Sequence, residues 1–209
     1  MCVSVKRLSC KNHKAEIISN TKGGGEVHRK TTKEILAESF LELTEKKPID
    51  KITITNITDN CGMSQPTFYN HFKDKYDLIV WIYVTAGQKV MDKIGENGYQ
   101  WRDTLADGAE YFLINRDFAI NALTNTSGQN SFMMYVSKSN VDLLVTEVRK
   151  KIMTEQIPKI IMGMIKVYCY GTVQFIFEWI VEDVHLPKET VVEIFEKSLP
   201  EPLKMYLYD

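Results

Sequence analysis

Residues 53–75 read Thr-Ile-Thr-Asn-Ile-Thr-Asp-Asn-Cys-Gly-Met-Ser-Gln-Pro-Thr-Phe-Tyr-Asn-His-Phe-Lys-Asp-Lys and predict two short helices joined by a tight turn. Thr53 and Ser64 stand where the helices would begin, and either hydroxyl can cap a helix by accepting a backbone N–H. Gly62 follows the first helix, where glycine most readily enters the left-handed region. Pro66 falls in the first turn of the second helix, where its missing N–H costs nothing.

Each of the two predicted helices has an apolar side. The apolar positions recur at helical spacing: Ile54, Ile57 and Cys61 in the first helix, and Phe68 and Phe72 in the second. We therefore expect these side chains to face a shared core.

The opposite side of the second helix is polar and carries no acidic residue. It holds Gln65, Thr67, Tyr69, Asn70 and His71. Such side chains suit a helix in the DNA major groove, where base edges present hydrogen-bond donors and acceptors between walls of phosphate. The alternative is an ordinary helical hairpin whose polar face is only solvated.

The longer segment resembles a known signature. Residues 62–79 read Gly-Met-Ser-Gln-Pro-Thr-Phe-Tyr-Asn-His-Phe-Lys-Asp-Lys-Tyr-Asp-Leu-Ile. This run is similar to the helix-turn-helix of the TetR family of bacterial transcription regulators, and its core Phe-Tyr-x-His-Phe-x-x-Lys is specific. Thr58 and Cys61 depart from the pattern, because the family often has alanine at these positions.

The resemblance assigns roles to residues of the polar face. It implies that Tyr69, His71 and Lys75 grip phosphates. The residues expected near the bases or the backbone are Thr55, Gln65, Thr67 and Asn70. With the capping residues and the proline of the pair, the predicted DNA-binding set is Thr53, Thr55, Ser64, Gln65, Pro66, Thr67, Tyr69, Asn70, His71 and Lys75.

The rest of the chain predicts an all-α fold, with an N-terminal three-helix helix-turn-helix head and a C-terminal helical domain for dimerisation and effector binding. Thr31 and Glu34 form a capping box at the start of a first helix. Lys46 and Lys47 would interact favourably with the dipole at the end of this helix, and Pro48 would end it. Further helices are expected at 74–94, where Asp74 is a capping residue, and at 101–115, 116–125, 130–154, 159–183 and 188–199. Breaks between helices are expected at Pro158, Pro187 and Pro200 in the later part of the chain.

These patterns divide the chain into three parts. Residues 1–28 are expected to be disordered or a non-native leader, residues 29–75 the DNA-binding domain, and residues 76–209 the helical domain. The segment Lys-Gly-Gly-Gly-Glu at 22–26 can be encoded by a run that resembles a ribosome-binding site, and Val27 by a GTG start codon. Residues 1–26 would then be absent from the native protein; the alternative is a flexible basic arm.

Charge is unevenly distributed. The formal net charge of the 209 residues is −1, so the chain is not a bulk polycation, and DNA binding must come from a local face. Residues 1–33 nevertheless hold eight Lys or Arg against two acidic residues. This basic stretch would either add phosphate contacts or be a solvated tail.

The cysteine and histidine positions predict neither a metal site nor a cofactor. Cys2, Cys10, Cys61 and Cys169 show no C-x-x-C or Cys/His ligand spacing. Scattered cysteines suit a reducing cytoplasm, and the N-terminus lacks the apolar core of a signal peptide.

The longest apolar stretch, Ile160–Val181, is about as long as a membrane span. Lys166, Gln174 and Glu178 interrupt it, and a charge near the bilayer centre costs roughly 2.5–3.5 kcal/mol. We therefore expect a buried interface helix. With the following helix it resembles half of a four-helix dimer interface, and the predicted interface residues are Gly171, Phe175, Trp179, Val191 and Phe195.

The resemblance also implies a small-ligand pocket within the C-terminal helices. Its predicted lining is aromatic and thioether side chains, which suit an apolar or mixed ligand: Trp101, Tyr111, Phe112, Phe118, Met133, Met134, Tyr135 and Tyr168. The alternative is a plain core, because such residues at helical spacing usually pack against one another.

The function predicted from the sequence is a dimeric, sequence-specific DNA-binding regulator of palindromic operators, acting as a repressor released by a small ligand. The C-terminal part, including Tyr-Gly-Thr-Val-Gln-Phe-Ile-Phe-Glu-Trp-Ile at 170–180, is similar to a TetR subgroup with regulators like the dihydroxyacetone kinase operon activator. That similarity leaves open an activator controlled by a protein partner. A helical adaptor that does not bind DNA is a further alternative. An enzyme is not expected, because no phosphate loop, nucleophile elbow or paired acid with spaced histidines stands out.

Overall fold

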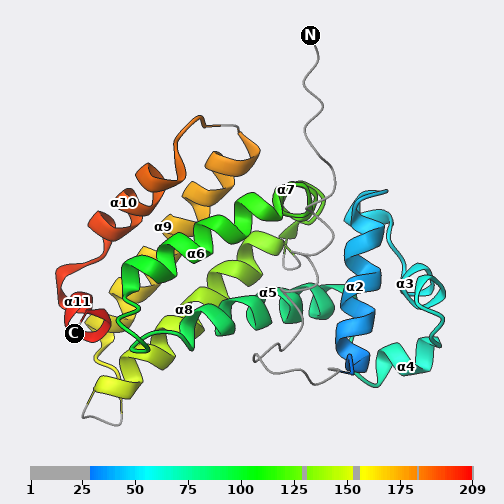
Figure 1. The fold of residues 1–209 in the computed structure, drawn as a ribbon, viewed down its shortest axis with the longest axis horizontal. Helices are drawn as coiled ribbons and strands as arrows, with labels where there is room; N and C mark the ends of the chain where they lie inside the picture. The colour runs from blue at the N-terminus through cyan, green and yellow to red at the C-terminus, as the bar shows by residue number, and fades with distance from the viewer. Residues whose placement is uncertain (1–28, 129–130, 153–155, 183, 209) are drawn as a thin grey trace. The chain divides into compact units, whose positions relative to one another are not determined.

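The computed structural model describes residues 29–128, 131–152, 156–182 and 184–208. Over these ranges the regular elements are ten α-helices and one short 3-10 helix, without a strand (Figure 1). The all-α prediction is therefore confirmed. The expected leader at residues 1–28 lies outside the described residues.

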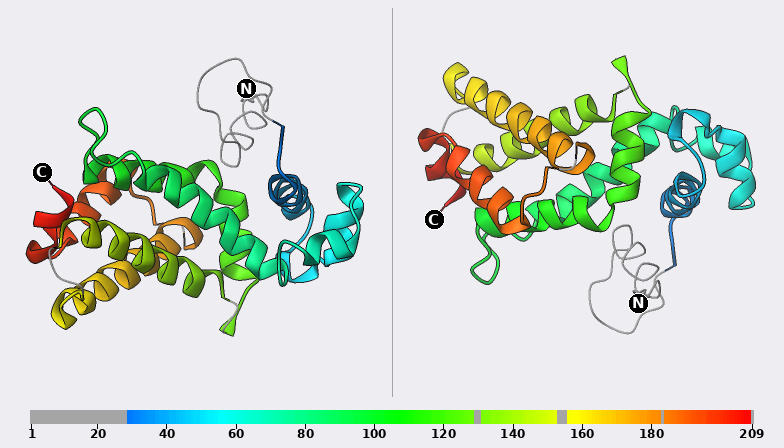
Figure 2. Two further views of the ribbon diagram at one scale, coloured as in Figure 1. Left: turned by 90° about the horizontal axis from the view of Figure 1, so that it is seen from below. Right: turned by 90° about the horizontal axis from the view of Figure 1, so that it is seen from above.

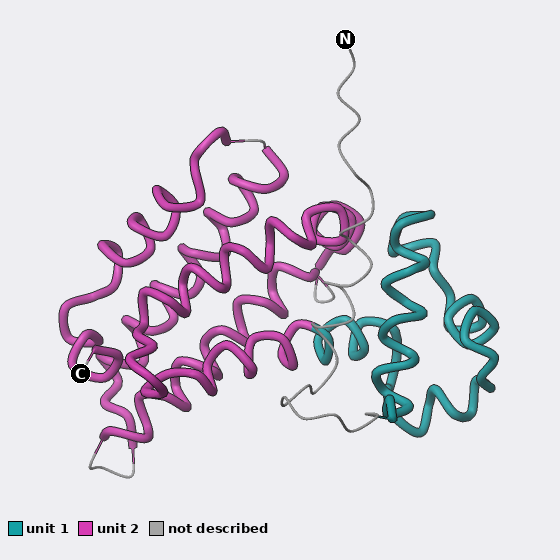
Figure 3. The backbone as a smooth tube through the Cα atoms, viewed as in Figure 1, with its two compact units in different colours: residues 1–82 teal, residues 83–209 magenta. Residues whose placement is uncertain are grey.

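The chain separates into two compact units, residues 1–82 and residues 83–209 (Figure 3). The division falls within helix α5 (Lys75–Met91), so this helix contributes residues to both units. The sequence had placed the boundary between residues 75 and 76, at the start of the same helix. The exact domain limits stay a prediction.

The first unit contains α2 (Thr32–Thr44), the 3-10 helix η1 (Ile49–Lys51), α3 (Ile54–Asn60), α4 (Gln65–Tyr69) and the start of α5. These are the three helices of the expected head and the beginning of the long helix that follows them. Among its largest fully buried side chains are those of Phe40, Ile57 and Phe68, which come from three different helices. A single small core therefore holds the helix pair of residues 53–75 against α2.

The start of α2 is the predicted capping box. The Thr31 hydroxyl accepts the Glu34 N–H at 3.3 Å, and the Glu34 carboxylate accepts the Thr31 N–H at 2.7 Å. Its end was predicted wrongly, because the helix ends at Thr44 and has no basic residue in its last turn. Lys47 instead donates to the Asn56 side chain on α3, at 2.8 Å.

The second unit contains the rest of α5 and the helices α6 (Trp101–Ile114), α7 (Arg116–Thr124), α8 (Phe132–Lys151), α9 (Lys159–Val181), α10 (Lys188–Ser198) and α11 (Glu201–Leu207). Helix α8 packs along α9, and α6 packs along α10 (Figures 1 and 2). Helix α7 packs against α9, and α11 packs against both α8 and α9. The buried cluster that joins these helices includes Trp101, Leu144, Ile165 and Leu203.

The second unit differs from the sequence predictions most clearly at the end of α5 and in an additional helix, α11. Helix α5 ends at Met91 instead of Ile94, in a loop where Gly95, Asn97 and Gly98 all have positive φ. Helix α11 was not predicted, because Pro200 was taken only as a stop. Pro200 is in fact its N-cap residue, and a second proline follows in the first helical turn, where proline needs no hydrogen-bond partner.

Candidate functional site

The turn between α3 and α4 has the geometry of a Schellman motif. Gly62 has φ +68°, the left-handed conformation that its position was predicted to require. The Met63 N–H donates to the Thr58 carbonyl at 2.9 Å, and the Gly62 N–H donates to the Asp59 carbonyl at 3.3 Å. Two carbonyls at the end of α3 are thereby satisfied, and the direction in which the chain enters α4 is fixed.

The caps of the two helices are those expected from the sequence. The Thr53 hydroxyl accepts the Asn56 N–H at 3.1 Å, and the Ser64 hydroxyl accepts the Thr67 N–H at 3.2 Å. Pro66 lies in the first turn of α4. Short-range backbone chemistry therefore sets where both helices begin.

An aromatic row anchors α4 to the core of the first unit. Phe68 and Phe72 are buried, as predicted, with ring centroids 5.7 Å apart. Phe72 in turn meets Trp81 edge-on at 5.8 Å, and the Lys33 ammonium lies 5.5 Å from the Phe72 ring centroid. The buried side of α4 is thus held rigidly, which leaves the polar side facing outward.

A buried polar contact between α2 and α3 was missed by the sequence analysis. The Ser39 hydroxyl is buried and donates to the Ile57 carbonyl at 2.7 Å. It also accepts from the Asn60 side-chain amide at 3.1 Å. The sequence gives no sign of this contact, because a serine among apolar residues at helical spacing does not reveal its partner.

The predicted DNA-binding residues lie on the surface of the first unit, apart from two. Thr53, Thr55, Ser64, Gln65, Pro66, Tyr69, Asn70 and His71 are exposed, whereas Thr67 and Lys75 are half-buried. The Gln65 side-chain amide donates to the Thr55 hydroxyl at 2.9 Å and links the first turns of α3 and α4. The surface of α4 therefore presents hydroxyl, amide, phenol and imidazole groups without a carboxylate.

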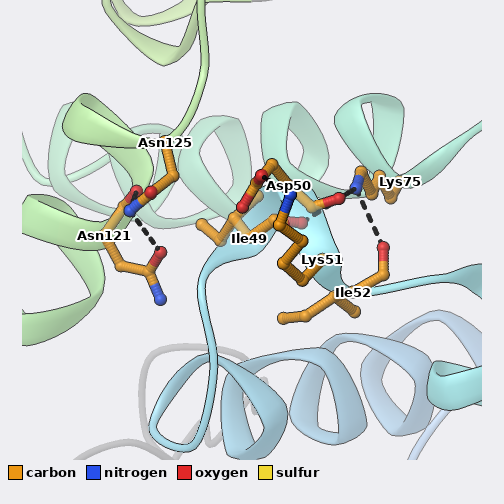
Figure 4. Close-up of polar contacts among 7 residues, drawn as sticks. All are labelled: Ile49, Asp50, Lys51, Ile52, Lys75, Asn121 and Asn125. Atoms are coloured by element: carbon orange, nitrogen blue, oxygen red, sulfur yellow. Dashed lines mark hydrogen bonds and ion pairs between the residues drawn. The ribbon is translucent and has the colours of Figure 1, made fainter.

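Lys75 is engaged within the protein. Its ammonium donates to the carbonyls of Ile49, Asp50 and Ile52 at 2.8, 3.0 and 2.9 Å (Figure 4). A lysine ammonium has three N–H donors, so these bonds use all of them. Burial lowers the pKa of Lys75, and the nearby carboxylates of Asp50 and Asp74 oppose this shift. We call this contact the Lys75 clamp; in this arrangement the ammonium faces η1, not a phosphate.

A cavity of about 140 Å³ lies within the second unit, lined from α5, α6, α8, α9 and α10. Of the predicted pocket residues, Trp101, Tyr111, Phe112 and Tyr168 line it. Phe118, Met133, Met134 and Tyr135 do not line this cavity, and their contact with a ligand stays a prediction. Phe118 packs edge-on against Phe132 at 5.8 Å, and Met134 is exposed.

The cavity-lining groups that the sequence did not predict include the Tyr83 hydroxyl and the Asn140 side chain. The Tyr83 hydroxyl donates to the Asn140 side chain at 2.7 Å, and both residues line the cavity. The Tyr168 hydroxyl donates to the Phe195 carbonyl at 3.0 Å. Burial raises the pKa of Tyr83 and of Tyr168, and it raises the pKa of Cys169 to about 12. These groups are therefore uncharged at neutral pH.

Most residues of the predicted dimer interface lie in the interior of a single chain, and their role in a dimer stays a prediction. Trp179, Val191 and Phe195 are buried within a single chain, and the Trp179 indole N–H donates to the Leu186 carbonyl at 3.0 Å. Phe175 packs edge-on against Phe195 at 5.8 Å, so it also serves the interior. Of the predicted set, only Gly171 is exposed.

Helix α9 instead has a different apolar face on its outside. Ile160 is 66% exposed, Val167 is 74% exposed and Tyr170 is 52% exposed, and Gly163 and Gly171 lie on the same face. In the described part of the chain, α9 is also the one helix whose length and composition would let it cross a membrane; 33% of that apolar window is buried. A row of exposed apolar side chains like this one is typical of a surface that another protein covers.

Groups of three or more His, Cys, Asp or Glu side chains arranged to hold a metal ion do not occur among the residues that the structure describes.

Comparison with known proteins assigns both units to families. The family model described as "Bacterial regulatory proteins, tetR family" matches residues 35–80, and the model described as "Transcriptional regulator C-terminal region" matches residues 99–201. Together the two matches cover the helix-turn-helix and most of the second unit.

A curated relative and two solved structures are similar to the chain. The relative, the HTH-type dhaKLM operon transcriptional activator DhaS of Lactococcus lactis, is 21% identical over 120 residues, which is 57% of this chain and 64% of that protein, under two thirds of its length. The structure of the dihydroxyacetone kinase operon activator DhaS has a TM-score of 0.55 and 18% identity, covering 84% of this chain and 98% of the other. The TetR family repressor AlkX from Dietzia sp. has a TM-score of 0.51 and 17% identity, covering 85% and 98%. At these identities, the structural matches establish the fold alone.

Proposed function

Because the chain belongs to the TetR family of bacterial transcriptional regulators, we propose that it binds a palindromic operator as a homodimer and releases it when a small ligand enters the cavity. The observation that carries DNA binding is the polar face of α4, which is exposed, lacks acidic residues and is held by buried Phe68 and Phe72. A regulator of this kind needs no catalytic group, and we propose no enzymatic activity.

We assign the DNA-binding residues of the first unit to bases or to phosphates by the chemistry and position of their side chains. Gln65, Thr67 and Asn70 have short amide or hydroxyl groups that suit base edges, although Gln65 must exchange its bond to Thr55 for one to a base. Tyr69 and His71 are exposed at the end of α4 and suit phosphate oxygens. Lys75 would position this surface through its clamp.

Dimerisation would use the outer face of α9. An exposed row that includes Ile160, Val167 and Tyr170 is costly to leave in water, and a two-fold axis lets one such face cover its copy. Gly163 and Gly171 on this face allow two helices to approach closely. Two heads related by the same axis would then read the two halves of a palindrome.

The dimer is tested by analytical ultracentrifugation of Val167→Glu, which places a charge in the middle of the exposed row. We expect the wild-type protein to sediment as a dimer and the variant as a monomer with unchanged helical content. Lys166→Glu is the control, because Lys166 is exposed on the adjacent position of the helix and is outside the apolar row. A variant that still sediments as a dimer would place the interface elsewhere.

The direction of regulation has two candidates. Repression relieved by a ligand is supported by the cavity in the second unit, which has room for a small molecule. Activation is favoured by one observation, the similarity to DhaS, which is named as a transcriptional activator. A reporter gene placed behind the selected operator separates the two, because deletion of the regulator raises expression in the first case and lowers it in the second.

The first experiment is selection of bound fragments from sheared genomic DNA, followed by sequencing. We expect an enriched inverted repeat whose half-sites are separated by about one helical turn or a multiple of it. His71→Ala is expected to weaken binding to all sequences and to reduce the salt dependence, whereas Gln65→Ala changes the preferred sequence. Absence of enrichment at low salt would favour the helical adaptor. Since its proposed target is chromosomal DNA, we propose a cytoplasmic location.

A further inference from the structure

The Tyr111 hydroxyl lies in the interior of the second unit and has no hydrogen-bond partner among the described residues. Burial raises the pKa of this hydroxyl, so it is surrounded by protein and not by bulk water. The atom nevertheless keeps accessible surface, and Tyr111 lines the cavity. The open space beside the hydroxyl is therefore the cavity. Native proteins rarely keep a polar group in the interior without a partner, so this hydroxyl calls for a reason.

Two further polar side chains lie beside Tyr111. The Tyr83 ring packs edge-on against the Tyr111 ring, with centroids 6.1 Å apart, and the Tyr83 hydroxyl donates to Asn140 Oδ1 at 2.7 Å. Asn140 Nδ2 has no partner in the described part of the chain and also keeps accessible surface. All three residues line the cavity, and we call them its polar end. The polar end offers a hydroxyl that can donate or accept and an amide N–H that can donate.

The rest of the cavity wall is uncharged, and its polar groups are occupied. Among the described residues that line the cavity, none is Lys, Arg, Asp, Glu or His. The Tyr168 hydroxyl donates to the Phe195 carbonyl at 3.0 Å and lies in hydrogen-bond range of the Trp101 N–H. The Thr104 hydroxyl lies in the same range of the Tyr99 hydroxyl. A charged ligand in this space would leave its charge unpaired, which is far more costly than burying a neutral group.

The volume limits the size of the occupant. A cavity of about 150 Å³ lined by leucine, isoleucine and phenylalanine holds one benzene molecule. The cavity here is about 140 Å³. We therefore expect a molecule of the size of one six-membered ring with a small substituent.

We propose that the effector is a small, neutral, mainly apolar molecule with one hydrogen-bonding oxygen or nitrogen, which pairs with the Tyr111 hydroxyl at the polar end of the cavity. This inference rests on the proposed ligand response, and it names the chemical class that the cavity selects. Alcohols, ketones and amides of this size belong to the class. Carboxylates do not, because they are charged, and hydrocarbons do not, because they leave the Tyr111 hydroxyl without a partner.

The test measures binding of three seven-carbon probes to the full-length protein by isothermal titration calorimetry without DNA. The probes are benzyl alcohol, toluene and benzoate, which share a ring and differ in the polar group. We expect benzoate to bind at least about tenfold more weakly than benzyl alcohol, because its carboxylate would find no cationic partner in the cavity. Equal affinities for benzyl alcohol and benzoate, or no binding of any probe, would overturn the proposal.

Tyr111→Phe tests the named hydroxyl, because it removes one oxygen and keeps the ring. We expect this variant to bind benzyl alcohol about fivefold more weakly and toluene no more weakly than the wild type. Thr172→Val is the control, because Thr172 lines the cavity but its hydroxyl already donates to the Tyr168 carbonyl at 3.0 Å. Its affinities for both probes should stay at the wild-type values. Equal losses for benzyl alcohol and toluene in Tyr111→Phe would refute the role of the hydroxyl.

Gly108→Leu tests whether the probes bind in the cavity. Gly108 lines the cavity, and a Cβ added there meets no atom within 4 Å, so a leucine side chain has room to occupy the space of the ligand. We expect this variant to lose affinity for benzyl alcohol and toluene to the same extent. Wild-type affinity for both probes would mean that they bind elsewhere, which would overturn the proposal.

The calorimetry and the operator selection fail independently. Circular dichroism first confirms that each variant keeps its helical content. A protein that binds benzyl alcohol through Tyr111 but selects no operator would contradict the proposed function and leave the cavity assignment standing. A protein that selects an operator but binds benzoate as tightly as benzyl alcohol would contradict only the ligand class.

Discussion

Replacing Lys75 with methionine tests the Lys75 clamp. Methionine keeps most of the aliphatic stem but removes the ammonium, and with it the bonds to the carbonyls of Ile49, Asp50 and Ile52. Water can replace the ammonium at the exposed Asp50 carbonyl, so the other two bonds carry the effect. A hydrogen bond to a charged group contributes about 1.5 kcal/mol at the lower end of its range, so the unfolding free energy of the head should fall by about 3 kcal/mol.

The assay is urea unfolding followed by circular dichroism. With an m value of about 2 kcal/mol/M, a loss of about 3 kcal/mol lowers the urea midpoint of the head by about 1.5 M. Lys73→Met is the control, because Lys73 is exposed and lies two residues away, so it changes the net charge equally. If Lys75→Met and Lys73→Met unfold at the same urea concentration, the clamp adds no stability and the phosphate-binding role implied by the family resemblance regains support.

Four further changes have expected outcomes. Ser39→Ala leaves the Ile57 carbonyl with only the weaker Cys61 thiol donor at 3.3 Å and should lower the urea midpoint by an amount equivalent to about 1 kcal/mol, whereas an unchanged midpoint would mean that the contact is replaceable. Gly108→Ala adds a methyl with no atom within 4 Å, so it should raise the unfolding free energy by about 1 kcal/mol, measured as a higher urea midpoint, whereas a lower midpoint would show that the added methyl is not accommodated. Gly171→Ala meets nothing within one chain and should stabilise α9, yet ultracentrifugation should show weaker dimerisation if two copies approach closely there. Burial raises the pKa of Cys169 to about 12, so iodoacetamide at pH 8 should leave this thiol unmodified in the folded protein and modify it in urea, as peptide mass spectrometry would show. The Cys169 thiol ionises at a lower pH in the unfolded protein than in the folded protein. The free energy of unfolding should therefore fall as the pH rises above the ordinary pKa of a thiol.

The parts of the fold that the sequence predicted depend on neighbours within a few residues. The capping box of Thr31, the cap of Ser64 and the left-handed turn at Gly62 all follow from the chemistry of four to six consecutive residues. The apolar spacing of Phe68 and Phe72 likewise identified the buried side of α4. These signals fixed the helix-turn-helix almost completely.

The parts that the sequence missed depend on contacts between distant segments. The carbonyls bound by Lys75 lie 23 to 26 residues earlier in the chain. Every residue type has a backbone carbonyl, so the sequence does not show which carbonyls bind a lysine. The side chain of a lysine therefore looks equally suited to a phosphate or to a carbonyl cluster. Only the packing of η1 against α5 decides between them.

The second unit was harder for a related reason. Helix α9 is apolar on most of its circumference, so its composition does not tell which side meets its own chain and which side stays outside. Trp179 was expected at an interface and is interior, whereas Val167 was not singled out and is exposed. The same ambiguity explains why only some of the predicted pocket residues line the cavity. The crossing of α6, α8 and α9 decides which aromatic rings border it.

As the proposed dimer interface, the outer face of α9 would also tie the activity of the protein to its abundance. A surface that is covered by its own copy obeys mass action, so the number of dimers rises with the square of the monomer concentration at low expression. Operator binding would then depend on the number of protein copies in the cell as well as on the ligand, through the exposed side chains of Ile160, Val167 and Tyr170. A cell that doubled expression of this gene would change operator occupancy more than twofold without altering a single contact to DNA.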